Sequence, residues 1–227
     1  MPEVDRIGVV VPARDEADHV GACLAALAEA AQHVAVPVEV VVVVNATLDA
    51  TAAIARRHGA RVLERTEPGV GAARAAGVTA LLEGHDPTRT WIATTDADSR
   101  VPPRWLAHHL DLAAQGAEAV VGTIMLPPDA TPGHAAWWRH YQRGVDSEGH
   151  RHVHGANLGV HASAYCSVGG FAALPVHEDA DLVHRVVASG RRVVWTTEHS
   201  VVTSPRLVGR APSGVATDLR AWSAPAG

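Results

Sequence analysis

Short hydrophobic runs and longer mixed stretches alternate along the first 126 residues. The runs predict strands, and the continuous apolar runs at 7–11 and 38–44 predict strands buried on both faces, because such strands show no alternation of polar and apolar positions. The runs lie at 7–11, 38–44, 61–64, 91–95 and 119–126. The stretches between them predict helices at 16–31, 49–58, 69–82 and about 102–114. Alternation over short connections predicts an α/β fold with a mainly parallel central sheet flanked by helices on both faces.

The pattern changes after residue 126. The elements expected there are a loop at 127–133, helices at 135–145, 163–169 and about 182–189, and a strand at 192–197. The last 24 residues, 204–227, carry Pro, Gly, Ser and Arg and predict an irregular tail. We therefore expect a single domain over residues 1–203.

The composition excludes some classes of protein. The 227 residues are 47% hydrophobic and only 4% aromatic, so the core is built from Val, Ala, Leu and Ile. A net charge of −5 argues against a dedicated nucleic-acid binder, which would carry a basic face. Lysine is absent, so phosphate contacts must come from Arg, backbone N–H groups or a metal.

The expected compartment is the cytoplasm. Two isolated cysteines, Cys23 and Cys166, form neither a disulfide framework nor a zinc site and suit a reducing environment. The charged start of the chain is unlike a signal peptide. The longest apolar run, 34–44, is too short for a transmembrane segment.

The Asp96-Ala97-Asp98 motif follows the strand predicted at 91–95. Residues two apart on a strand project to the same side, so both carboxylates reach one point. Such oxygen ligands suit Mg²⁺ or Mn²⁺, and the cation would hold a diphosphate. The alternative is a solvated turn. Ligands of parallel sheets bind beyond the carboxyl ends of the strands, so this motif should share a crevice with 12–16 and 45–49.

Four further segments each have a functional and a structural interpretation. Gly69–Arg74 is a small-residue loop at a helix start, suited to phosphate but lacking a complete dinucleotide fingerprint. The acids of 177–181 supply a general base or stabilise a helix N-terminus. The alternate histidines in 150–154 either bind a transition metal, since their imidazoles face one way, or form a short His-rich tract without a metal site. The aromatic residues of 137–141 form an acceptor platform or pack in the core.

Taken in order, these segments resemble glycosyltransferases of the GT-A fold, and in particular the large family 2. The resemblance spans about residues 6–200. The segments that carry it are Val9–Glu16, Val41–Thr51, Gly69–Gly77, Thr95–Asp98, Gly155–Leu158, Val168–Phe171 and Glu178–Leu182.

The resemblance implies a role for individual residues. Those expected to border the nucleotide-sugar donor are Pro12, Ala13, Arg14, Glu16, Asn45, Arg74, Asp96, Ala97 and Asp98. Those expected to hold the metal are Asp96, Asp98 and His199. The expected general base is Asp179 with Glu178 beside it, and the expected acceptor contacts are Asn157 and Trp138. Residues 1–126 would then form a nucleotide-binding half and 127–203 an acceptor half.

The chain departs from the family pattern where the donor base is expected. Val44-Asn45 replaces the usual pair of acids, Ala46 replaces a common Gly, and Asp15 replaces a common Asn. The donor nucleotide is therefore not assigned.

The implied activity is transfer of a hexose-like sugar from a nucleotide-diphosphate sugar to an acceptor hydroxyl, with Mn²⁺ or Mg²⁺ and with inversion. The acceptor is a small molecule, a glycan or a lipid-linked group. Two alternatives stay open. One is a sugar-phosphate nucleotidyltransferase, although 12–16 is not the Gly-rich basic loop that such enzymes need. The other is a non-catalytic sugar-nucleotide-binding protein.

Overall fold

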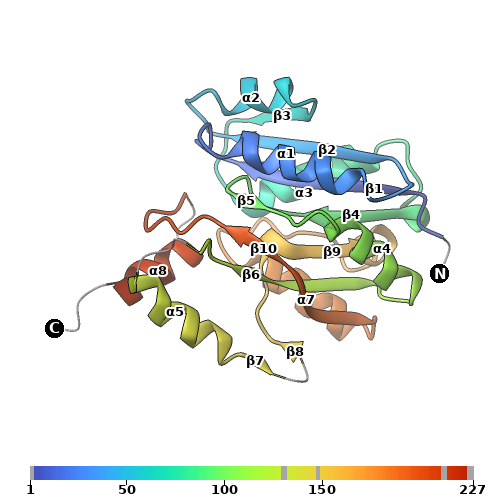
Figure 1. Ribbon diagram of the computed structural model, residues 1–227. Coiled ribbons are helices and arrows are strands. Elements are labelled where there is room, and N and C mark those ends of the chain that lie inside the picture. Colours follow the sequence, from blue (N-terminus) through green and yellow to red (C-terminus); the bar gives the residue numbers. More distant parts are fainter. Residues whose placement is uncertain (1–2, 129–131, 147–148, 211–213, 224–227) are drawn as a thin grey trace.

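The structure is a computed structural model that describes residues 3–128, 132–146, 149–210 and 214–223. An eight-stranded sheet runs through its centre in the order β3-β2-β1-β4-β9-β6-β10-β5 (Figure 1). Its strands are β1 (Arg6–Ala13), β2 (Val38–Asn45), β3 (Arg61–Arg65), β4 (Thr90–Thr94), β5 (Ser99–Arg100), β6 (Ala119–Met125), β9 (Leu158–His161) and β10 (Val193–Thr203). A separate ribbon consists of β7 (Val145–Asp146) and β8 (Gly149–His150).

Helices surround this sheet. The α-helices are α1 (Val20–Ala31), α2 (Thr51–Arg57), α3 (Val70–Leu82), α4 (Trp105–Ala114), α5 (Pro132–Gln142), α6 (Ala162–Ser167), α7 (Glu178–Ala188) and α8 (Val215–Ser223). Two 3₁₀ turns, η1 (Pro87–Arg89) and η2 (Gly155–Asn157), precede β4 and β9.

The sheet is mainly parallel, as the sequence predicted. Strand β1 pairs in parallel with β2 and β4, β2 with β3, and β6 with β10. Strand β9 was not expected, and it lies antiparallel between β4 and β6. It has only four residues, one of them Gly159, and is too short to show a hydrophobic period. Strand β5 is likewise antiparallel, to β10.

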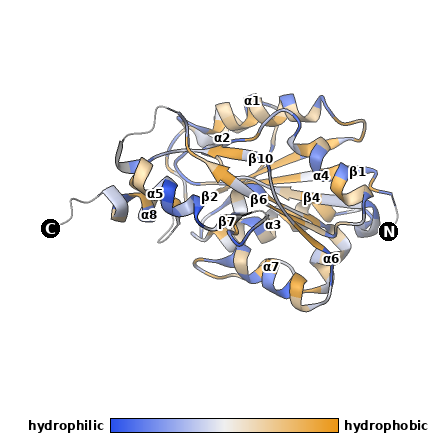
Figure 2. Cartoon of the chain, turned by 60° about the horizontal axis from the view of Figure 1, so that its bottom comes forward, coloured by the Kyte–Doolittle hydropathy of each residue, from blue (hydrophilic) through white to orange (hydrophobic). Residues whose placement is uncertain are grey.

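Two hydrophobic cores cover the two faces of the sheet. Val9 and Val11 of β1 pack with α1, α2 and α4, whereas Val10 packs with α3, α6 and α7. Figure 2 shows the largely hydrophobic strands between helices of mixed hydropathy. Helix α3 approaches the sheet closely because Gly77 has no side chain, and a Cβ there would lie 2.5 Å from Val10. The buried strand predicted at 7–11 is therefore confirmed, and the one predicted at 38–44 is buried from Val41 onward. Strand β3, at the edge of the sheet, is half-buried or exposed.

The expectation of an irregular tail was wrong for residues 215–223, which form α8. Helix α8 lies against α5 (Figure 1), and the pair encloses a third, smaller core around Ile124, Trp137, Tyr141 and Leu219. The aromatic residues of α5 form that core with Leu219, and the local composition of residues 204–227 does not predict this contact. Within the described residues, the helices are too short or too polar to span a lipid bilayer.

Candidate active site

A cavity of about 790 Å³ opens where β1, β2, β4 and β10 end. The segments 12–14 and 96–98 line it together with Glu16 and Asn45, which confirms the crevice expected at the carboxyl ends of the strands for these residues. Asp15 and the expected residues 46–49 do not line it. The nine residues expected to bind the donor all contribute to its wall: Pro12, Ala13, Arg14, Glu16, Asn45, Arg74, Asp96, Ala97 and Asp98. Their roles in binding stay predictions.

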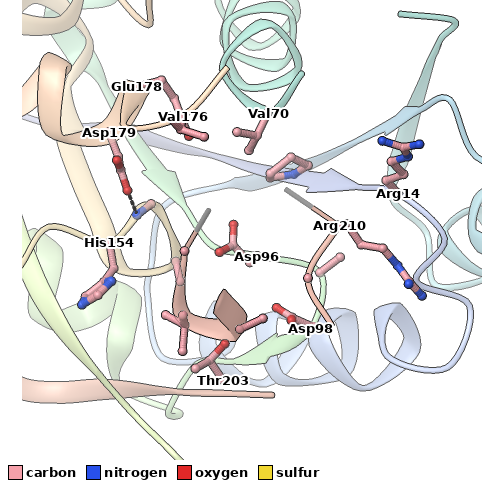
Figure 3. Close-up of a pocket in the computed structure, with 18 of the residues that line it drawn as sticks. Arg14, Val70, Asp96, Asp98, His154, Val176, Glu178, Asp179, Thr203 and Arg210 are labelled. Carbon is pink, nitrogen blue, oxygen red and sulfur yellow. Dashed lines mark hydrogen bonds between the residues drawn. The ribbon is translucent and has the colours of Figure 1, made fainter. Parts of the chain in front are cut away.

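Asp96 and Asp98 point into this cavity (Figure 3), and each pairs with an arginine through one oxygen. Asp96 Oδ1 accepts a hydrogen bond from Arg74 Nη2 at 2.6 Å. Asp98 Oδ2 lies 2.9 Å from Arg206 Nη2, and Arg206 Nη1 donates to Glu16 Oε1 at 2.7 Å. The other oxygen of each aspartate lies outside these arginine pairs.

The electrostatics of the cavity favour a bound cation. Burial raises the pKa of Asp98 to about 6, and the negative charge of Asp96 adds to the shift. Burial also raises the pKa of Glu16, against the opposing effect of Arg206. Ionisation of Asp98 and Glu16 is thus unfavourable without additional positive charge. Carboxylate oxygens are the donors that Mg²⁺ and Mn²⁺ prefer, and the metal-binding role of Asp96 and Asp98 stays a prediction.

Arg74 is a buried residue of the cavity wall that joins two parts of the chain. Besides Asp96 it pairs with Glu178, and the side chains of Arg74 and Glu178 are only 4% and 3% exposed. Burial by itself would lower the pKa of Arg74, but Asp96 and Glu178 raise it above its ordinary value. Gly155 makes room for the guanidinium, since a Cβ there would lie 2.2 Å from Arg74 Nη2. Arg74 and Glu178 therefore form a buried cross-link.

Asp179 is the half-buried acid at the start of α7 and also lines the cavity. Its Oδ2 accepts a hydrogen bond from the backbone N–H of Gly155 at 2.7 Å. Burial lowers the pKa of the neighbouring His154 to about 4, although Asp179 opposes the shift, so His154 is neutral near pH 7. The carboxylate of Asp179 is thus held in place without a salt bridge to His154 (Figure 3).

His199 does not join the two aspartates, contrary to the metal set implied by the family resemblance. It does not belong to the cavity wall, and its ring lies 4.8 Å from that of His108. It belongs to a β-bulge of β10, where the register shifts between Thr196 and Val201. The bulge directs His199 to α4.

The two residues expected to contact the acceptor also lie outside the cavity wall. Asn157 is buried, where its Oδ1 accepts from Trp105 Nε1 at 2.8 Å and its Nδ2 donates to Thr123 O at 2.8 Å. Trp138 packs against the core between α5 and α8 and stacks on Tyr141 at 5.4 Å. Both side chains therefore have structural partners here, and their expected contacts with an acceptor stay predictions.

The alternate histidines are held by separate partners in the structure. His152 Nε2 lies 2.9 Å from Tyr141 O, and His154 Nε2 lies 3.0 Å from the Tyr141 hydroxyl. His150 Nε2 lies 3.0 Å from Val121 O. Among the described residues the three rings do not form a metal-ligand group.

Several cavity residues were missed by the sequence analysis, which treated everything after Ser204 as an irregular tail. Arg206 pairs with Glu16 and Asp98, and Arg210 donates to Asp15 O at 3.0 Å. The start of α8 completes this wall through Asp218 and its neighbours. The sequence did contain a signal for them, because phosphate contacts in a chain without lysine fall to arginine and these two arginines follow the end of a strand.

Asn45, which replaces an expected acid, has a local structural role as well. In the amide orientation that satisfies both partners, it donates to Ala13 O at 3.0 Å and accepts from Gly69 N–H at 3.2 Å. It thereby ties together the ends of β1 and β2 and the loop before α3, and an acid at this position would lack the donor for Ala13.

Comparison with known proteins agrees with this architecture. The sequence model described as glycosyl transferase family 2 matches residues 8–165. A dolichyl-phosphate hexose transferase of Haloferax volcanii is 40% identical over 82 residues, which are 36% of this chain and 33% of that protein. The aligned region thus spans about a third of this curated relative.

Solved structures share the fold over nearly the whole chain. A Pyrobaculum calidifontis mannosyltransferase in complex with GDP-Man and Mn²⁺ superposes with a TM-score of 0.67, covering 98% of this chain and 70% of that one at 21% identity. TarS of S. aureus in complex with UDP-GlcNAc gives a TM-score of 0.64, covering 91% of this chain and 60% of that one at 13% identity. The chain belongs to glycosyl transferase family 2 and has the GT-A fold.

Proposed function

We propose that this protein transfers a sugar from a nucleotide-diphosphate sugar to an acceptor hydroxyl. The observation that carries the proposal is that Asp96, Asp98 and Asp179 face one cavity at the carboxyl edge of the sheet. Family membership supports the reaction class. The GDP-Man and UDP-GlcNAc complexes of the structural neighbours support the class of donor.

The two ends of the cavity suit the two halves of this reaction. Arg14 and Arg210 lie on one side of Asp96 and Asp98, and Asp179 lies on the other (Figure 3). The donor nucleotide would lie toward the arginines, with its diphosphate beside Asp98 and Arg206. A divalent cation bound by Asp96 and Asp98 would supply positive charge that stabilises the leaving nucleoside diphosphate. The Mn²⁺ in the mannosyltransferase complex supports this choice of cofactor.

Asp179 is the proposed general base. It accepts the proton of the acceptor hydroxyl while the hydroxyl oxygen forms a bond to the anomeric carbon and the bond from that carbon to the diphosphate breaks. A single displacement from the face opposite the leaving group inverts the anomeric configuration. Glu178 is committed to Arg74, so it acts as a positioning residue that fixes the start of α7.

The proposal is tested by thermal unfolding with a panel of nucleotide sugars and nucleoside diphosphates, each with Mn²⁺, Mg²⁺ or EDTA. A ligand at about a hundred times its Kd stabilises the folded state by roughly 2.7 kcal/mol. We expect a metal-dependent rise in Tm with one nucleotide class, followed by release of that nucleoside diphosphate when an acceptor is added.

Two other results would contradict transferase activity. Release of pyrophosphate from a nucleoside triphosphate and a sugar phosphate would identify a nucleotidyltransferase. Tight donor binding with neither hydrolysis nor transfer across a panel of small-molecule, glycan and lipid-linked acceptors would identify a binding protein.

Donor binding should also depend on pH through Asp98. Because its pKa is raised to about 6, the carboxyl takes up a proton as the pH falls through 6 and loses its charge toward the cation and Arg206. In the presence of Mg²⁺ we expect donor affinity to fall by about tenfold per pH unit below pH 6, the limit for one proton. Calorimetric titration from pH 5 to pH 8 measures this, and Asp98→Asn should bind weakly without the transition at pH 6. An unchanged transition in Asp98→Asn would assign it to another group.

A further inference from the structure

A group of three side chains of the types that ligate metals lies between α4 and β10, outside the cavity wall. It consists of His108, Glu198 and His199, and their ligand atoms all lie within 4.8 Å of one another. The two imidazole rings are 4.8 Å apart between centroids and inclined at 57°. His108 Nδ1 lies 3.6 Å from Glu198 Oε2.

The bulge in β10 assembles this group. His199 has φ of +55°, a left-handed conformation that non-glycine residues seldom adopt. Bulges change the direction in which a side chain points, and here the bulge places Glu198 and His199 beside α4. A regular strand would send these two adjacent side chains to opposite faces of the sheet.

Thr196 contacts the side chain of His108 and the backbone of Glu198. Its hydroxyl oxygen accepts from Glu198 N–H at 3.1 Å and lies 3.4 Å from His108 Nε2. A partner on one ring nitrogen fixes the orientation of the imidazole and leaves the other nitrogen to a metal. The Nδ1 of His108 is the nitrogen that faces Glu198.

We propose that His108, Glu198 and His199 bind one Zn²⁺ ion, distinct from the cation of the donor site. Two imidazoles and a carboxylate are three protein ligands, and water completes a tetrahedral set. Metal–ligand bonds of about 2.1 Å place tetrahedral ligands ~3.4 Å apart. The Glu198 side chain is 74% exposed and free to rotate inward by the remaining distance.

Ligand chemistry separates this site from the donor site. Imidazole nitrogens favour Zn²⁺ over Mg²⁺, whereas the all-oxygen pair Asp96 and Asp98 suits Mg²⁺ or Mn²⁺. The ion would join α4 to β10, the strand that continues to Thr203 in the cavity wall. Its expected effect is stabilisation of that connection, independent of whether the protein transfers sugars.

The test is Zn²⁺ binding by the full chain, stripped of metal and kept in excess Mg²⁺ so that the oxygen site is occupied. Bound metal is counted by atomic emission after gel filtration, and Co²⁺ serves as a coloured substitute. We expect one Zn²⁺ per chain, a rise in Tm, and Co²⁺ absorption bands of a site with nitrogen ligands.

Variants separate the proposed ligands from other histidines. His199→Ala and Glu198→Gln should each weaken Zn²⁺ binding, and Thr196→Val should weaken it by about 10–100-fold, as loss of a partner behind a ligand does. The matched control is His184→Ala, an exposed histidine on α7, which should bind like the unaltered protein. His108 is mostly buried, so the exposed Glu198 provides the variant least able to disturb folding.

Absence of Zn²⁺ binding in the unaltered protein would overturn the proposal. So would binding that survives unchanged in both His199→Ala and Glu198→Gln, because the ion would then lie elsewhere. Activity is not needed for either readout.

Discussion

Asp179→Asn is expected to lower the rate of sugar transfer by about 10²–10⁴-fold, the usual contribution of a general base. The replacement keeps the shape of the side chain and an oxygen to accept the hydrogen bond from Gly155 N–H. It removes the basic carboxylate. Donor affinity should therefore stay close to that of the unaltered protein, so the loss falls on kcat. Steady-state kinetics and donor titration measure the two effects separately.

The matched control is Asp181→Asn in the same first turn of α7. Asp181 pairs with Arg185 at 2.6 Å, so its replacement also removes one negative charge near the helix N-terminus. It does not belong to the cavity wall, and we expect a rate near that of the unaltered protein. Equal rates for Asp179→Asn and Asp181→Asn would exclude Asp179 as the base.

Arg74→Met should destabilise the protein by about 3–5 kcal/mol, because breaking a buried ion pair leaves a charge without compensation. Glu178 would bear most of this cost, since its side chain is 3% exposed and that of Asp96 is 37% exposed. For a chain of this size each kcal/mol lowers Tm by about 2–4 °C, which gives a fall of roughly 6–20 °C. Thermal and urea unfolding measure the change.

The destabilisation should increase with pH. Burial raises the pKa of Glu178 even beside Arg74, which opposes the shift. Without Arg74 this pKa rises further above that of the unfolded chain, so the folded state loses stability as the pH rises and the carboxyl ionises. Arg74→Met should therefore be less destabilising at pH 5 than at pH 8.

Two variants check this interpretation. Adding Glu178→Gln to Arg74→Met should recover part of the stability, because the double variant buries no unpaired carboxylate from Glu178. Arg56→Met breaks an exposed pair with Glu64 and should cost less than about 1 kcal/mol. If Arg74→Met were no more harmful than Arg56→Met, the buried cross-link would contribute nothing to stability.

Local patterns were sufficient for the first strands of the sheet. The valine runs of β1 and β2 and the apolar β4 are buried on both faces, so composition alone identifies them. Their parallel arrangement then brings Pro12, Asn45 and Asp96 to one edge. Short or atypical elements escaped the same reasoning. Strand β9 is stabilised by pairing with β4 and β6, and α8 by packing against α5.

The candidate site was predicted in outline, but its pairings were not. Arg74 lies 104 residues from Glu178 in the sequence, and Arg206 lies 190 residues from Glu16. The hydrophobic periodicity of a short segment does not predict contacts over such separations. In the structure Arg74 pairs with Glu178, whereas Asp179 lies in the cavity wall without a salt bridge to Arg74. The structure also moves His199 from the aspartates to His108, because a bulge changes the direction of the strand's side chains.

The family, the alternation of strands and helices, and the edge of the sheet at which the acids gather were all predictable from the order of residues along the chain. These properties follow from hydrophobic periodicity and from the order of short motifs, which are local and readable along one chain. Tertiary structure decided which carboxylates are paired with arginines, which are exposed to the cavity, and which histidines face one another. Those outcomes depend on burial and on charge pairs between distant segments, whose energies arise only when the chain is folded.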